Sequence, residues 1–173
     1  MTQELIDLKN SILEGRYADA LAIVDELEGI SKKAILRQIK SFLRIFLIHL
    51  IKNQIEKRLT NSWAASIRNA IREIKEVNLK DNQTSYYINS NEWEKFIEEE
   101  VIEDAIADAS DEMMNGKFTR SQLSGMLDKS QILTTATSLL ALTYTYSPKE
   151  LPAIMDDYLS ELAGGEDWIN REK

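Results

Sequence analysis

The stretch LRIFLIHLIKNQIEKRLTNSW, Leu43 to Trp63, decides the fold class of this chain of 173 residues. Apolar side chains in its first part occupy nearly all sides of a helix, which predicts a central helix buried among others. The longest apolar run, Ile45 to Ile51, is too short to cross a bilayer. We therefore expect a helical core built around this stretch.

Helical periodicity continues on both sides of the central stretch. The chain has only two prolines and six glycines, so few residues interrupt its helices. We predict an all-α protein, an irregular bundle of about seven helices around the central apolar helix. The expected helices span residues 3–14, 17–27, 31–59, 63–77, 92–114, 132–146 and 148–162, with a short helix inside 117–130. Ser31 is the expected cap of the central helix.

The length predicts one domain, residues 1–173, able to bury a sizeable core. It would comprise a main bundle over about 1–115, a C-terminal helical segment over about 117–163, and a polar tail over 164–173. In that tail Trp168 is either an exposed anchor for another protein or packed against its own domain. The predicted core consists of Ile39, Phe42, Leu43, Phe46, Leu50, Trp63, Ile67, Ile71 and Ile74.

Charge is unevenly distributed along the chain. Residues 31–75 hold eleven Lys or Arg and two Glu, net +9, whereas residues 81–112 hold eleven Asp or Glu and one Lys, net −10. The two regions either fold against each other and neutralise, or leave a basic surface for nucleic acid or an acidic partner. We favour mutual neutralisation, because runs of surface charge are usually solvated faces, and the net charge of −8 argues against affinity for nucleic acid.

Two charged surfaces are candidate binding sites. A basic stripe would contact a partner protein or, as the alternative function, the phosphates of nucleic acid. An acidic face offers paired carboxylates for a metal-dependent hydrolase, a weaker alternative because no Glu-x-x-His motif accompanies it. The basic stripe is Lys33, Arg37, Lys40, Arg44, Arg68 and Arg72, and the acidic face is Glu99, Glu100, Glu103, Asp104 and Asp108.

The single histidine, His49, is expected to have a structural role. Catalytic or metal-binding histidines have companions in reach, and positions three or four residues from His49 carry none. We expect a core or interface ring that makes one or two hydrogen bonds, with a partner near Trp63 or near Tyr86 and Tyr87. Lys52 belongs with His49 and Trp63 to the same structural motif.

Several function classes lack their residues. The chain has no cysteine, so thiol catalysis and thiolate metal sites are excluded, and it has no glycine-rich nucleotide fingerprint. The polar N-terminus has no secretory signal pattern. We expect a cytoplasmic, non-enzymatic protein-interaction module without a cofactor. Its partner would be another protein or a second copy of itself, with nucleic acid less favoured and no membrane.

A set of segments resembles the domain-of-unknown-function family 29, in its longer, cyanobacterial-type members. The resemblance covers nearly the whole chain and implies an all-helical bundle, with a His-containing central helix beside a helix that starts with Trp. It implies no established activity, substrate or cofactor. The segments are EGRYADALAIVDELEGISKKAILRQIKSFL (14–43), HLIK (49–52), SWAASIR (62–68), YYIN (86–89), EW (92–93) and MLDKSQIL (126–133).

Overall fold

The computed structural model describes residues 2–171, and within this range the chain forms α-helices, one short 3-10 helix and no strand. This confirms the predicted all-α class. The described range contains nine α-helices instead of about seven. The acidic helix is divided and the tail contains a helix of its own, whereas the helices expected over 17–27 and 31–59 form one continuous helix.

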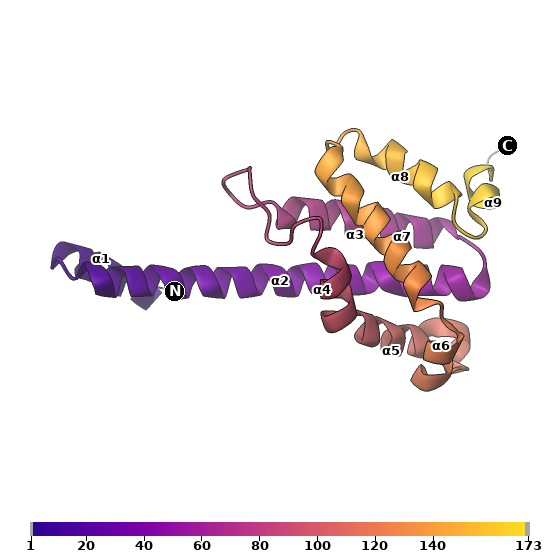
Figure 1. Cartoon of the computed structure of the whole chain (residues 1–173), viewed down its shortest axis with the longest axis horizontal. Coiled ribbons are helices and arrows are strands. Elements are labelled where there is room, and N and C mark those ends of the chain that lie inside the picture. Colours follow the sequence, from indigo (N-terminus) through magenta and orange to yellow (C-terminus); the bar gives the residue numbers. More distant parts are fainter. Residues whose placement is uncertain (1, 172–173) are drawn as a thin grey trace. The chain divides into compact units, whose positions relative to one another are not determined.

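The chain divides into two compact units, residues 1–38 and residues 39–173, where the sequence predicted one domain. Unit 1 contains α1 (Thr2–Leu13) and the first part of α2 (Tyr17–Glu56). A three-residue connection with Gly15 at φ 73° turns the chain between these helices. Helices joined by so short a loop form an antiparallel hairpin, and Figure 1 shows α1 folded back along the start of α2. We call this pair the N-terminal hairpin.

Helix α2 is continuous from Tyr17 to Glu56, so the predicted break at Gly29 and the cap at Ser31 are wrong. An interior glycine costs a helix only about 1 kcal/mol relative to alanine. The residues on both sides of Gly29 are good helix formers, and their combined propensity outweighs that cost.

Unit 2 contains the main core. Between residues 39 and 51, α2 buries seven apolar side chains, and α3 (Asn61–Asn78) adds the buried face of Ile67, Ile71 and Ile74. Of the nine predicted core residues, only Phe42 and Trp63 are half-buried rather than buried. The remaining helices are α4 (Trp93–Glu100), α5 (Ile102–Glu112), η1 (Met113–Gly116), α6 (Arg120–Met126), α7 (Lys129–Thr145), α8 (Leu151–Ser160) and α9 (Gly165–Ile169).

Helix α7 connects the parts of unit 2, because it contacts α3, α4 and α8 (Figure 1). Its threonines and tyrosines also tolerate strand, but the helix predicted for 132–146 is confirmed within Lys129–Thr145. The predicted acidic helix over 92–114 is instead interrupted at Val101, whose backbone leaves helical geometry between α4 and α5.

The segment predicted as a polar tail is packed rather than released. Gly164 has φ 71°, and a Cβ atom there would lie 2.7 Å from Arg58 Cα. A Cβ on Gly165 would lie still closer to the backbone of Leu159. The two glycines therefore permit close approach of backbones, and α9 folds onto unit 2. Within residues 2–171, no helix combines the length and apolar character that a bilayer crossing requires.

Candidate functional site

The basic and acidic regions of unit 2 pair with each other. Lys40 Nζ lies 2.9 Å from Glu100 Oε2, and Arg44 Nε lies 3.2 Å from Asp108 Oδ2. All four side chains are about half exposed, so each pair contributes roughly 0–1 kcal/mol to stability. These ion pairs matter mainly because they neutralise Lys40 and Arg44, and a paired cation is less available to bind the phosphates of nucleic acid.

The other members of the basic stripe lie elsewhere. Arg68 Nη1 donates to Asp156 Oδ1 at 2.9 Å, on the side of α3 that meets α8. Arg72 donates to the Asn69 side chain of its own helix at 2.8 Å. Lys33 and Arg37 are exposed and belong to unit 1. Within unit 2, the structure thus distributes the stripe over different helix faces.

The acidic face forms no ligand cluster in the described part of the chain. Glu103 lies 3.4 Å from Lys129 Nζ, and Glu99 and Asp104 are exposed. Over residues 2–171, no three His, Asp or Glu side chains come together in a way that would hold a metal ion. The carboxylates therefore provide surface charge and ion pairs here.

His49 is half-buried, and its Nδ1 lies 2.8 Å from the carbonyl oxygen of Ile45, four residues earlier on α2. Because a carbonyl only accepts, Nδ1 carries the proton in this contact. The predicted partner near Trp63 or the Tyr86–Tyr87 loop was wrong. Burial is the main cause that lowers the pKa of His49, and the charge of Lys52 acts in the same direction.

Lys52 and Trp63 lie close together in the structure. Lys52 Nζ lies 5.9 Å from the centroid of the Trp63 ring, and the Arg58 guanidinium lies 4.8 Å from the same centroid. Lys52 also faces Glu112 at 3.9 Å. Cation–π contacts of this kind stabilise a half-exposed ring, so Lys52 and Arg58 help to hold Trp63 at the corner between α2 and α3.

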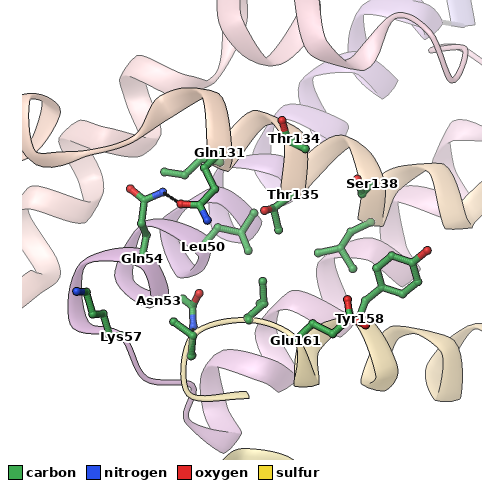
Figure 2. A pocket seen from close by; sticks show the side chains of 14 residues that line it. Leu50, Asn53, Gln54, Lys57, Gln131, Thr134, Thr135, Ser138, Tyr158 and Glu161 are labelled. Carbon is green, nitrogen blue, oxygen red and sulfur yellow. Dashed lines mark hydrogen bonds between the residues drawn. The ribbon is translucent and has the colours of Figure 1, made fainter. Parts of the chain in front are cut away.

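A pocket of about 520 Å³ lies between the end of α2, α7 and α8 (Figure 2). Its size falls within the range of small-molecule sites. The amides in its wall are already engaged: Gln54 bonds Gln131 and both backbone groups of Asp128, and Asn53 donates to the carbonyls of Arg58 and Ala163. These bonds tie loops together and give the pocket walls a structural role.

A buried polar network fastens α3, α4 and α7 to one another. Tyr144 donates to Ile88 O at 2.6 Å and accepts from Trp93 Nε1 at 2.7 Å and from Asn78 Nδ2 at 3.1 Å. Burial raises the pKa of Tyr144 to about 12. A tyrosine hydroxyl used three times in this way is saturated, so the network is structural.

Trp168 is buried in α9, where its Nε1 donates to Asn61 Oδ1 at 3.1 Å. The guanidinium groups of Arg68 and Arg171 lie 5.8 Å and 5.1 Å from its ring centroid. Of the two alternatives left open by the sequence, the structure has the one in which Trp168 packs against its own unit. It therefore offers no exposed anchor.

Of the twelve large apolar side chains that are exposed within the described residues, seven belong to the N-terminal hairpin, which sequence reasoning did not anticipate. Among residues 2–38 only Ser11 and Ala20 are buried, on the sides where the two helices meet. Exposed fractions reach 73% for Leu13, 65% for Tyr17 and 64% for Leu21. We call the following six residues the apolar face: Leu5, Ile6, Ile12, Leu13, Tyr17 and Leu21.

Five of these residues, all except Ile6, recur at the helical spacing that predicts helices over 3–14 and 17–27. The sequence could not show whether a partner helix within the chain covers them. A signal was nevertheless present, because the apolar positions of 3–14 fill two adjacent rows, Leu5 with Ile12 and Ile6 with Leu13, and one neighbouring helix covers a single row.

Comparison with known proteins identifies a family without a described activity. A family model described as "Domain of unknown function DUF29" matches residues 3–124, which includes the N-terminal hairpin and helices α3 to α5. Comparisons with curated proteins and with solved structures found no match. Because the family match covers well over half of the 173 residues, this chain belongs to the DUF29 family.

Proposed function

We propose that this chain is a protein-interaction module that binds a partner on the apolar face of its N-terminal hairpin. The observation that carries this proposal is the exposure of six large apolar side chains within 17 residues of chain, from 47% for Ile6 to 73% for Leu13. Monomeric soluble proteins rarely expose contiguous apolar patches larger than a few hundred Å². A face of this kind is typical of a surface that another protein covers.

The charged surfaces predicted from the sequence are weaker candidates for the partner-binding site. Lys40 and Arg44 face carboxylates of α4 and α5, and Arg68 faces Asp156. Releasing these cations for nucleic acid would require breaking their ion pairs. Trp168, the other candidate anchor, is buried. The N-terminal hairpin, with its six exposed apolar side chains, is therefore the better-supported binding surface.

A non-enzymatic role forms part of the same proposal. It is supported by the engagement of Asn53, Gln54 and Gln131 in loop-fastening hydrogen bonds in the pocket of Figure 2. We also infer a cytoplasmic location, which the cysteine-free composition favours.

The test is a quantitative affinity purification from lysate of the source organism with three forms of the full chain. They are the wild type, Ile12→Ser with Leu21→Ser on the apolar face, and Asn10→Ser with Ala22→Ser elsewhere on the same helices. We expect a set of proteins to be retained by the wild type and the control pair and lost with the apolar-face pair. Equal retention by all three forms would overturn the proposal, and helicity measured by circular dichroism checks that each form is folded.

A further inference from the structure

We propose that the occupant of the apolar face is a second copy of this chain, with two N-terminal hairpins packed face to face around a twofold axis. This inference rests on the proposed function and names its partner. Each hairpin would supply two helices of a four-helix arrangement, the usual way in which helix pairs bury a second apolar side.

The first argument is that four of the six residues of the apolar face, two from each helix, lie on one side of the hairpin, whereas Ile6 and Leu13 lie about 100° further round and face away from α2. Successive residues are about 100° apart on a helix. Ser11 on α1 and Ala20 on α2 are buried and mark the contact between the helices. We measure the angle of each residue about its helix axis from these two positions. Leu5, Ile12, Tyr17 and Leu21 all lie between about 60° and 120°, rotated in the same direction. Antiparallel helices that face each other mirror this sense of rotation, so equal rotation brings these residues to a common side.

The opposite side of the hairpin is polar, which checks this geometry independently. A shallow groove of about 440 Å³ runs there, and residues of both helices line it. Asp7, Glu14 and Asp19 border it, and Arg16 pairs with Glu14 at 2.8 Å and with Asp19 at 3.1 Å. By the same rotation these residues lie on the other side of the line joining the helices. The hairpin thus has one side with this acidic groove and an opposite side on which Leu5, Ile12, Tyr17 and Leu21 gather.

The second argument is the charge of the apolar side. Four charged residues lie within it by helical position: Lys9 on α1, and Asp25, Glu28 and Lys32 on α2, all exposed. Their formal charges cancel, although residues 2–32 as a whole hold seven acidic and three basic residues. A surface that meets its own copy benefits from carrying both signs in equal number. A strongly basic or acidic partner would be better matched by a face with net charge.

The third argument is area. Taking about 200 Å² for each fully exposed large side chain, the exposed fractions of the four residues that share one side, Leu5, Ile12, Tyr17 and Leu21, correspond to on the order of 470 Å². Specific interfaces bury about 800 Å² from each partner. These four side chains alone therefore supply more than half of the contribution that one subunit makes to a stable dimer.

The decisive experiment is sedimentation equilibrium of the purified full chain between about 1 and 100 µM, where interfaces of this size are populated. We expect a mass twice the 19.8 kDa of one chain. The pair Ile12→Ser and Leu21→Ser should weaken association on the order of a hundredfold or more. The control pair Asn10→Ser and Ala22→Ser should sediment like the wild type. Because the face carries balanced charge, a tenfold rise in salt should leave the association nearly unchanged.

Single cysteines test the geometry, because the chain contains none of its own. We would make Ile12→Cys, Tyr17→Cys and Leu21→Cys one at a time, with Asn10→Cys and Ala22→Cys as controls on the groove side. A disulfide between copies requires Cα atoms within about 7 Å. At least one face cysteine should link two chains under mild oxidation, and the controls should not. Equal linking at both sets, or at neither, would overturn the twofold packing.

The outcomes separate this inference from the proposed function. A monomer at every concentration, or a dimer that persists in the apolar-face pair, would overturn the second-copy inference. If lysate proteins were still lost only with the apolar-face pair, the proposed function would stand with a different protein as the partner. A monomer at every concentration, together with equal retention of lysate proteins by all three forms, would overturn both proposals.

Discussion

Helix α2 passes through two different environments. Between residues 17 and 38 only Ala20 is buried, whereas between residues 39 and 51 seven apolar side chains are buried. Both stretches are helical and both carry apolar residues at helical spacing. The comparison shows that amphipathic pattern establishes a helix, while burial depends on what else the chain folds against it.

Stability should follow the same division. Unit 2 has a core that includes Phe46, Trp93 and Ile106, all almost completely buried. Unit 1 has one pair of helices with two buried residues. Regions with few buried apolar contacts open at lower free energy than cores do. The exposed apolar residues of unit 1 contribute little to folding within the chain, which leaves them available for association.

The largest expected effect compares two positions of α2, one in each unit. Phe46→Ala should lower the free energy of unfolding by about 3–5 kcal/mol, because it leaves a cavity in the core of unit 2. Leu21→Ala should change it by less than about 0.5 kcal/mol, because Leu21 is mostly exposed. Urea denaturation in dilute protein measures both. Similar losses for the two variants would contradict the division between the units.

The next effect concerns the polar network of unit 2. Tyr144→Phe should lower the free energy of unfolding by about 1–3 kcal/mol. The substitution removes the acceptor of Trp93 Nε1 and one of the two acceptors of Asn78 Nδ2. Tyr158→Phe is the matched control at an exposed tyrosine and should fall within about 0.5 kcal/mol of the wild type. Thermal unfolding followed by circular dichroism distinguishes them. A neutral Tyr144→Phe would show that the network does not stabilise unit 2.

The smallest effect is a pH dependence that belongs to His49 in unit 2. Burial lowers its pKa in the folded state, so the unfolded state binds more protons between that pKa and the ordinary value of about 6.5. The free energy of unfolding should therefore decrease as pH falls below about 6.5. His49 is the only histidine, so His49→Gln should remove this part of the slope. Denaturation midpoints of both proteins across this range provide the measurement, and parallel curves would contradict the assignment.

Much of unit 2 could be predicted from sequence because its residues follow simple periodicities. Ile39, Leu43 and Phe46 repeat on one face of a helix, and they are buried. The break expected at Gly29 failed because a single glycine costs a helix little. Polar contacts were harder still, since Tyr144 finds Trp93 and Asn78 over 51 and 66 residues of chain. Spacing within one helix contains no information about such distant partners.

The candidate site was missed for a related reason. The sequence shows that Leu5 and Leu21 are apolar and helical, and the usual inference from that pattern is a buried stripe. Their exposure depends on the absence of a covering helix among residues 2–38, which only the arrangement of α1 and α2 reveals. The charge asymmetry instead predicted binding surfaces that include Lys40 and Glu100, and these two side chains pair with each other.

The positions of the tryptophans determine what fluorescence can report. All three, Trp63, Trp93 and Trp168, lie in unit 2, and unit 1 contains none. Intrinsic tryptophan emission therefore follows the unfolding of residues 39–171 and does not detect melting of the N-terminal hairpin, whereas far-ultraviolet circular dichroism registers helices of both units. Denaturation curves from the two signals would separate wherever the hairpin unfolds independently. A tryptophan introduced by Tyr17→Trp would add an emission signal for the hairpin itself.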